Sequence, residues 1–326
     1  MRENDHRLVD IDGLGALVNK MSMSEATHGT GHLVHGGDMS IAYADRAQTR
    51  TTGYPAGQLS RGVDSPADLS VIVPIYNEQD QLWSMAELLA QTLDRIIGPS
   101  CWQFVLVDNG SIDDTSKVLG AIVGTWPKSR VLKLDLPNYG TALRVGLQAA
   151  EAPFAYVINV DFWDPLFLRW SWANRNQYDL ILGSKRADPT LNKLPAYRKF
   201  LSAGLNLIFQ VFFEFVGSDT HGQKLIRLSA IRDILPHCIM ERGQFDTELT
   251  MRALRGGLWV AEVPVPIVQA RGPRNLMLVK IYRNVVDLWR LRRIMRSVPS
   301  LRTRYHRWAR EDMEEMHIVS WRKHTE

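Results

Sequence analysis

The stretch Ile158–Pro165, which reads INVDFWDP, places two carboxylates and an amide directly after an apolar run. Asp161 and Asp164 offer the oxygen ligands that hard divalent cations prefer, whereas Asn159 offers only a neutral carbonyl oxygen. A cation held here would bridge the protein to a substrate diphosphate and neutralise charge on the leaving group. A neutral ligand weakens metal affinity without forbidding binding, so the stretch predicts a weakened or rearranged site for Mg²⁺ or Mn²⁺.

Two further polar stretches also follow apolar runs. Tyr76 and Glu78 come after LSVIVPI, and an aromatic ring beside a carboxylate suits a base and a ribose. The run 108–111, DNGS, offers a carboxylate and an amide for ribose hydroxyls or a base edge, and its glycine permits a close backbone turn. An ordinary Asx turn that caps the next helix would use the same residues, and both interpretations remain open.

The motif content argues against several function classes. No GxGxxG follows the first apolar run and no GxxxxGK[ST] occurs, which disfavours a dinucleotide oxidoreductase and a P-loop enzyme. The two cysteines, Cys101 and Cys238, cannot form a disulfide framework, and their spacing matches no zinc motif. We therefore expect a protein of a reducing compartment.

The residues above need a scaffold, and the periodicity of the chain predicts an α/β fold. Of the 326 residues, 45% are hydrophobic, which is ample for a buried core. Short apolar runs alternate with helical patterns, and this predicts a mostly parallel sheet flanked by helices. We place the first strand at 69–76 and the next helix at 82–96, with Asn77 as its N-cap. Such sheets bind ligands beyond the carboxyl ends of their strands, where the polar stretches lie.

The chain divides into three predicted parts. Residues 1–68 read as a flexible leader, residues 69–275 hold the α/β domain, and residues 276–326 form a basic amphipathic helical extension. Between residues 271 and 310, eleven arginines and one lysine accompany a single acid, and Trp289, Tyr305 and Trp308 are interleaved with them. This pattern is typical of a helix lying on an anionic membrane, although a solvated basic face packed on the domain would look the same. No window approaches the ~20 apolar residues that a bilayer span needs, so we expect peripheral contact.

Nine motifs connect these stretches to a known family. In chain order they are LSVIVPIYNE, VLVDNGSIDDT, NYGTALRVG, VINVDFWDP, LGSKR, YRKFLSAGLN, DTHGQKL, FDTEL and VAEVPVP. Over about residues 69–275 the chain resembles family 2 glycosyltransferases of the GT-A (Rossmann-like) fold, and among them the dolichyl- or polyprenyl-phosphate mannose synthase branch. The resemblance implies an inverting transferase that moves a hexose from a GDP- or UDP-linked sugar to a polyprenyl phosphate at the membrane surface.

The resemblance also implies roles for individual residues. The nucleotide pocket of the family matches Pro74, Tyr76, Glu78, Asp108, Asn109, Gly110 and Ser111. Asp161 matches the second acid of the family's DxD metal motif, and Asn159 stands where the first acid belongs. Trp163 takes the position of a Gln that helps to hold the metal in the synthase branch.

The chemical nature of the acceptor, a phosphate or a hydroxyl group, determines which further residues the reaction would need. A phosphate monoester, with a second pKa of about 6, is largely dianionic at neutral pH and needs no base. The resemblance implies that Arg198 and Ser202 grip this phosphate, together with Lys185 or Arg186 as the basic residue after Gly-Ser. We therefore expect these four side chains to position a phosphate acceptor.

A hydroxyl acceptor would need a general base, for which Asp246 and Glu248 in FDTEL are the candidates. Both acids would equally well serve to cap a helix. Two alternatives to the leading interpretation remain: a transferase acting on a soluble hydroxyl compound, and a non-catalytic nucleotide-sugar-binding protein. We expect a cytoplasmic protein, peripheral on the inner face of the cell membrane, without specific nucleic-acid binding.

Overall fold

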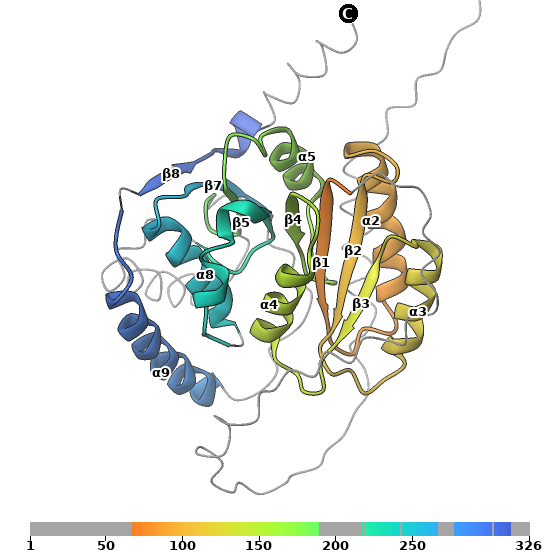
Figure 1. Ribbon diagram of the computed structural model, residues 1–326, viewed down its shortest axis with the longest axis horizontal. Coiled ribbons are helices and arrows are strands. Elements are labelled where there is room, and N and C mark those ends of the chain that lie inside the picture. The colour runs from red at the N-terminus through yellow and green to blue at the C-terminus, as the bar shows by residue number, and fades with distance from the viewer. Residues whose placement is uncertain are drawn as a thin grey trace, which may run out of the picture.

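The computed structural model describes residues 67–188, 217, 219–241, 243–266, 277–301 and 303–313. Within these residues the strands form one eight-stranded sheet in the order β3-β2-β1-β4-β6-β5-β7-β8 (Figure 1). The strands are β1 (Leu69–Ile75), β2 (Trp102–Asp108), β3 (Arg130–Lys133), β4 (Phe154–Val157), β5 (Leu180–Ser184), β6 (Lys224–Arg227), β7 (Trp259–Pro264) and β8 (Arg304–Arg307). β6 runs antiparallel to β4 and β5, and the other neighbouring pairs are parallel. The predicted mostly parallel sheet is confirmed, whereas residues 1–66 of the predicted leader lie outside the described residues.

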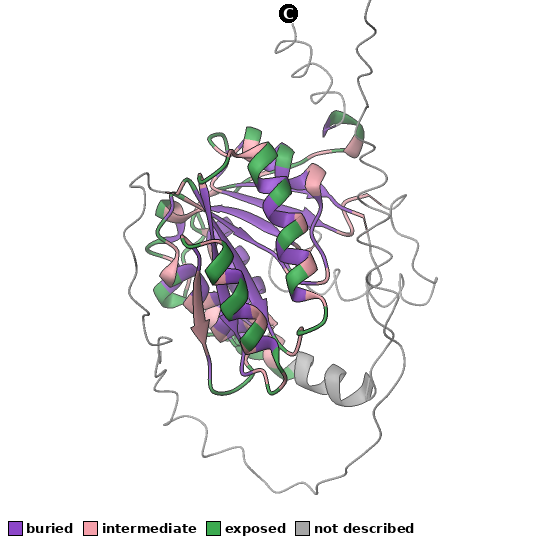
Figure 2. Ribbon diagram, turned by 90° about the vertical axis from the view of Figure 1, so that its right-hand side faces the viewer, coloured by how far each residue is buried: buried purple, intermediate pink, exposed green. Residues whose placement is uncertain are grey.

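Helices cover both faces of the sheet (Figure 1). One face carries α2 (Leu82–Ile96), α3 (Thr115–Thr125) and α5 (Pro165–Ala173). The other face carries α4 (Tyr139–Ala149), α8 (Gln244–Arg255) and α9 (Met277–Arg296), with α7 (Leu228–Ile231) and the 3₁₀ helix Leu235–His237 between β6 and α8. This arrangement buries β1 and β2 over their whole length, which explains their continuous apolar sequences (Figure 2).

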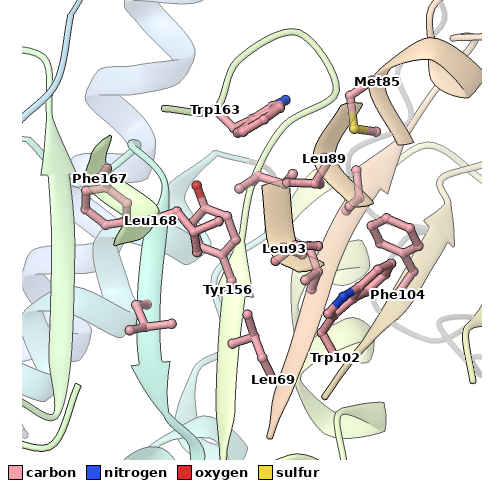
Figure 3. Close-up of a cluster of buried hydrophobic side chains, with 14 of the residues drawn as sticks. Leu69, Met85, Leu89, Leu93, Trp102, Phe104, Tyr156, Trp163, Phe167 and Leu168 are labelled. Atoms are coloured by element: carbon pink, nitrogen blue, oxygen red, sulfur yellow. The ribbon is translucent and has the colours of Figure 1, made fainter. Parts of the chain in front are cut away.

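Two hydrophobic clusters fill the layers on either side of the sheet. The α2-side cluster includes residues of α2, α3 and α5, and the α4-side cluster includes residues of α4, α8 and α9. Alternate residues of β1 serve different clusters: Val71 and Val73 pack with α2, and Ile72 packs with α4. Figure 3 shows part of the α2-side cluster, in which Leu89 and Leu93 pack among aromatic side chains from β2 and β4. The site residues described below lie at the carboxyl ends of the parallel strands, in the loops that follow them, and at the starts of β6, α4 and α8.

The predicted N-cap of α2 is wrong. The helix begins at Leu82, with Gln81 as its N-cap residue, and Asn77 lies four residues farther upstream in a loop. Asn77 uses its side chain for a contact with a distant loop, which local sequence does not reveal. Among the described helices, none is long and apolar enough to cross a membrane.

Candidate active site

The loops that follow β1 and β2 contact each other at the carboxyl ends of these strands. The last residues of the two strands, Ile75 and Asp108, lie opposite each other. The backbone N–H of Asn77 donates to Ser111 Oγ at 3.1 Å, and Asn77 Oδ1 accepts from the backbone N–H of Ile112 at 2.9 Å. Asn77 adopts a φ of 54°, a left-handed conformation that Asn tolerates better than most residues. The two predicted nucleotide-binding stretches therefore form one connected rim.

Asp108 and Asn109 organise this rim. Asp108 is fully buried; its Oδ1 accepts from the backbone N–H of Ser111 at 2.9 Å, and its Oδ2 accepts from the Ser116 hydroxyl at 3.1 Å. Asn109 Oδ1 accepts from the backbone N–H of Asn138 at 2.7 Å. Asp108 therefore holds the turn through the residue three positions ahead and contacts a side chain of α3, whereas the N-cap residue of that helix is Asp114. These contacts are not those of an Asx turn that caps the next helix, and ligand binding by Asp108 stays a prediction.

The remaining rim residues differ in accessibility. Gly110 has a φ of 78°, and a Cβ there would come within 3.1 Å of the backbone of residues 136–137, so a side chain at this position would be strained. Pro74 is buried within β1, Glu78 is partly buried and Tyr76 is exposed. Tyr76 and Glu78 are thus accessible to solvent at least in part, and their predicted contact with a base or a ribose stays a prediction.

Asp161 lies on the turn that follows β4, at the same edge of the sheet, because β4 runs parallel to β1. An isolated bridge between Asn159 and Phe162 closes the turn. Phe162 and Trp163 are buried in the α2-side cluster, where Figure 3 labels Trp163. Trp163 thus contributes to the hydrophobic core, and Asp161 is the partly exposed acid between buried neighbours.

A polar network connects this turn to α8. Lys224 Nζ pairs with Asp246 Oδ1 at 2.9 Å and donates to the carbonyl oxygen of Gly222 at 2.8 Å. The Lys224 and Asp246 side chains are only 1% and 2% exposed. The hydroxyl of Tyr139, the first residue of α4, donates to Asn159 Oδ1 at 3.2 Å and lies 3.5 Å from Asp246 Oδ2. The amide that replaces the first acid is therefore oriented by a tyrosine that also contacts a buried ion pair.

Tyr139 is a neutral member of this network. Burial raises the pKa of its hydroxyl well above the usual value, and the negative charges of Asp246 and Asp161 raise that pKa further. Tyr139 therefore remains a hydrogen-bond donor throughout the physiological pH range.

Asp164 is engaged in contacts with protein groups. Its Oδ1 caps α5 by accepting from the backbone N–H of Leu166 at 2.9 Å, and its Oδ2 pairs with Arg310 Nη1 at 3.2 Å. Gln223 Oε1 accepts from the backbone N–H of Asp164 at 3.1 Å and from the Tyr156 hydroxyl at 2.5 Å. A metal bound by Asp164 would compete with Arg310, and this predicted role stays untested.

Glu248 is buried and held by its own helix and the preceding loop. Its Oε2 accepts from the backbone N–H groups of Ile239 and Met240 at 2.8 and 2.6 Å, and its Oε1 accepts from Arg252 Nε at 2.9 Å. These contacts hold the loop before α8 to the helix. The predicted role of Glu248 as a general base stays untested.

The basic candidates lie partly inside the described residues. Lys185 Nζ is 4.7 Å from the ring centroid of Phe162, so its ammonium group lies beside the turn that carries Asp161. Arg186 follows the same strand end and is partly buried, with its backbone N–H donating to Ser184 Oγ at 3.1 Å. Arg198 and Ser202 lie outside the described residues.

The candidate oxygen ligands of the turn have the chemistry of a site whose cation is shared with a substrate. In the described part of the chain, no group of three or more His, Cys, Asp and Glu side chains could hold a metal ion. Asp161 and Asn159 supply one charged and one neutral oxygen. Mg²⁺ in particular is commonly bound by one or two carboxylates together with substrate phosphates, so the residues fit a metal that arrives with a diphosphate.

Three residues of this region escaped sequence reasoning: Tyr139, Lys224 and Arg310. The sequence offered one indication for Lys224, which directly precedes the apolar residues LI of a short strand. A charged side chain that is buried with such a strand needs a partner of opposite charge. Tyr139 lies within a quoted motif but not at one of its matched functional positions. Arg310 belonged to a basic cluster for which we expected solvent or a membrane, not a buried acid.

Comparisons with known proteins relate the chain to sugar transferases. A family model described as glycosyl transferase family 2 matches residues 70–233. The dolichyl-phosphate beta-glucosyltransferase of Dictyostelium discoideum is 28% identical over 225 residues, covering 63% of this chain and 68% of that protein. A dolichyl-phosphate beta-glucosyltransferase of Trichomonas vaginalis is 26% identical over 220 residues, covering 62% and 65%. The undecaprenyl-phosphate 4-deoxy-4-formamido-L-arabinose transferase of Pectobacterium atrosepticum is 29% identical over 153 residues, covering 45% of each protein. The chain thus spans about two thirds of the first two relatives and under half of the third.

One solved structure supports the fold class. The glucosyl-3-phosphoglycerate synthase of Mycobacterium tuberculosis in complex with UDP matches with a TM-score of 0.50 and 17% identity, covering 72% of this chain and 82% of that chain. A structure of the same enzyme with Mn²⁺, UDP and phosphoglyceric acid has a TM-score of 0.48 and 18% identity, covering 72% and 80%. The first likeness supports the predicted fold class, a mostly parallel α/β sheet of the GT-A type.

Proposed function

The chain belongs to glycosyl transferase family 2, and from that premise we propose that it moves a hexose from a nucleotide diphosphate sugar to a polyprenyl phosphate. The names of three relatives pair a sugar transferase with dolichyl phosphate or undecaprenyl phosphate, which supports this acceptor. The rim of the site supports a nucleotide donor, since the exposed Tyr76 ring and the partly buried Glu78 carboxylate have the chemistry that contacts a base and a ribose.

The observation that carries the choice of acceptor is the state of the two candidate bases. Asp246 is buried in an ion pair with Lys224, and Glu248 accepts hydrogen bonds from two backbone N–H groups and Arg252. A hydroxyl acceptor would need one of these acids to take up a proton, whereas a phosphate dianion attacks without a base. The geometry therefore favours a phosphate acceptor over a hydroxyl acceptor.

In the proposed reaction an oxygen of the acceptor phosphate attacks the anomeric carbon and inverts its configuration. The bond between that carbon and the donor diphosphate breaks, and the diphosphate leaves with the electron pair. Asp161 and Asn159 would hold a divalent cation, which supplies neutralising charge on the leaving diphosphate. Tyr139 holds Asn159 in one orientation, and Lys185 adds a positive charge beside the turn. Arg186, Arg198 and Ser202 are the proposed contacts of the acceptor phosphate.

The composition of the exposed face of α9 supports binding of the protein to a membrane surface. Leu291 and Met295 of this helix are buried against the α4-side cluster. The opposite face exposes Val286, Trp289, Arg290, Arg293 and Arg296. A tryptophan among arginines is the composition of a helix that binds anionic headgroups with its aromatic ring at the interface. We propose that this face docks on the cytoplasmic surface of a membrane, where a polyprenyl phosphate presents its headgroup.

A transfer assay with paired acceptors tests the proposal. Purified protein would be incubated with labelled UDP-glucose or GDP-mannose, Mn²⁺, and either a short-chain polyprenyl phosphate or the corresponding polyprenol. We expect label in the phosphate product and none in the alcohol. Transfer to the alcohol or to soluble hydroxyl compounds, with none to the phosphate, would overturn the choice of acceptor. Donor binding without transfer to any acceptor would favour a non-catalytic binding protein.

A further inference from the structure

We propose that Arg310 is a positioning residue of the transferase site, because it anchors the carboxylate at the end of the turn that carries Asp161. The inference rests on the proposed function and assigns a role to a segment outside the residues that match the family model, 70–233. Arg310 Nη1 lies 3.2 Å from Asp164 Oδ2 and 3.4 Å from the carbonyl oxygen of Pro264. One guanidinium thus ties the start of α5 to the end of β7.

The contact between Arg310 and Asp164 is largely shielded from water. The Asp164 side chain is 8% exposed and the Arg310 side chain is 21% exposed. Removing one partner of such a pair leaves a charge that has lost most of its hydration and its counter-charge. The Asp164 carboxylate would then reorient toward solvent or toward another cation, and the turn would follow.

The segment that presents Arg310 is firmly attached to the domain. β8 extends the sheet in parallel with β7, and the backbone N–H of Trp308 donates to the carbonyl oxygen of Glu262 at 2.9 Å. The Trp308 indole N–H donates to the Tyr178 hydroxyl at 3.2 Å, and the Trp308 ring packs against Trp170 with ring centroids 5.3 Å apart. A side chain on an anchored strand end holds its partner more precisely than one on a loose tail.

Asp164 connects Arg310 to the turn that carries the candidate metal ligands. It caps α5 through the backbone N–H of Leu166, and its own N–H donates to the buried Gln223. Only two residues, Phe162 and Trp163, separate it from Asp161, and both are buried. A shift of Asp164 therefore displaces Asp161 rather than being absorbed by a flexible linker. Side chains that support metal ligands in this indirect way typically change metal affinity about 10- to 100-fold when replaced.

The same segment offers a matched control. Arg307, three residues before Arg310, pairs with the buried Glu262 at 3.5 Å, and that carboxylate also accepts from the Tyr305 hydroxyl. The R307A variant therefore removes an arginine of the same segment that, like Arg310, pairs with a buried acid. It leaves Asp164 and the turn untouched.

Calorimetric titration of UDP and of GDP, each over a series of Mn²⁺ concentrations, tests the role of Arg310. We expect R310A to raise the Mn²⁺ concentration needed for half-maximal nucleotide binding about tenfold or more, with partial recovery in R310K. R307A should stay within about twofold of the wild type. D164N should reproduce the R310A defect, and the double variant D164N/R310A should be no worse than either single variant, because both remove one interaction.

Thermal unfolding of each variant separates positioning from a general loss of fold. A role in stability alone would lower the melting temperature without changing the Mn²⁺ dependence of the folded protein, and this result would overturn the inference. Equal defects in R307A and R310A would overturn it as well. Wild-type protein that binds nucleotide but transfers no sugar would refute the proposed function, while the Mn²⁺ titrations would still decide the role of Arg310.

Discussion

Lys224 Nζ and Asp246 Oδ1 form an ion pair at 2.9 Å in which both side chains are almost completely buried. The pair joins β6 to α8, and through Tyr139 it reaches the amide of Asn159. A buried pair is costly to break because the remaining charge has neither water nor a partner. Its integrity is therefore a condition both for the fold and for the shape of the site.

Replacement of Lys224 by Met should destabilise the protein strongly. We expect the free energy of unfolding to fall by about 3–5 kcal/mol, because Asp246 is left charged and buried. Urea denaturation followed by circular dichroism measures this change. Arg130, whose side chain is 33% exposed and pairs with the 72% exposed Glu151, provides the control: R130A should cost no more than about 1 kcal/mol. Equal costs for the two variants would contradict the importance assigned to the buried pair.

Replacements at the turn after β4 should change metal affinity in opposite directions. D161N removes the charge of the candidate ligand Asp161, so we expect Mn²⁺ binding in the presence of nucleotide to weaken about 100-fold or more. N159D adds a second carboxylate beside the donating Tyr139 hydroxyl, and we expect tighter Mn²⁺ binding than in the wild type. Electron paramagnetic resonance of free Mn²⁺ measures both. If both variants bind Mn²⁺ as the wild type does, the turn is not the metal site.

Charge reversal on α9 should abolish membrane association. In the triple variant R290E/R293E/R296E, the loss of about 1 kcal/mol per removed basic residue predicts at least a 100-fold weaker partition onto vesicles containing phosphatidylserine. Co-sedimentation measures the bound fraction. The variant R95E/K117E/K128E makes the same change in net charge in the α2–α3 region, on the other side of the sheet, and should retain binding. Equal loss in both variants would indicate a response to net charge rather than a docking face.

Gly222 should not tolerate a side chain. A Cβ at this position would overlap the backbone carbonyl oxygen of Gly183, so β5 and the start of β6 would have to separate. We expect G222A to lose about 3 kcal/mol of unfolding free energy or more. G124A is the matched control, since a Cβ at this helical glycine meets no atom within 4 Å and should be neutral or stabilising by up to about 1 kcal/mol. Similar unfolding curves for the two variants would refute the overlap.

Cys238 should be unreactive until the protein unfolds. Burial raises the pKa of its thiol to about 12, and the nearby Glu248 carboxylate adds to the rise. At pH 8 we expect Ellman's reagent to label the partly exposed Cys101 rapidly and Cys238 only in urea.

The same pKa shift has a consequence for stability. Because the folded pKa lies above the unfolded value of about 9, the contribution of Cys238 is present below pH 9 and is lost as the pH rises toward 12. The C238A variant should therefore show a shallower decline in unfolding free energy above pH 9 than the wild type. An equal decline in both proteins would contradict the assigned pKa.

Local patterns were sufficient for most of the fold. Continuous apolar runs such as 69–75 and 102–108 became buried strands, because helices on both faces of a sheet demand such sequences. The helical periodicity of 82–96 was likewise sufficient to place α2. The N-cap assignment of Asn77 failed because that side chain bonds to Ile112, 35 residues away, instead of to the helix that follows.

The candidate site was predicted unevenly for the same reason. Asp161 and the rim residues follow strand ends, and parallel strands bring such ends to one edge of a sheet. Asp164, Glu248 and Asp246 were chosen by residue type and spacing, which do not reveal that Arg310, Arg252 and Lys224 already neutralise them. Free and neutralised acids look alike in a sequence.

The sequence by itself determined the α/β class, the order of the elements, the edge of the sheet at which the polar residues gather and the resemblance to family 2 glycosyltransferases. These properties depend on short-range periodicity and on motifs that are contiguous in the chain. The tertiary structure decided which carboxylates are neutralised, how Tyr139 orients Asn159, and that Arg310 reaches Asp164 from 146 residues away. Such pairs are set by how packed elements meet in space, because each side chain needs a partner whose position no local pattern records.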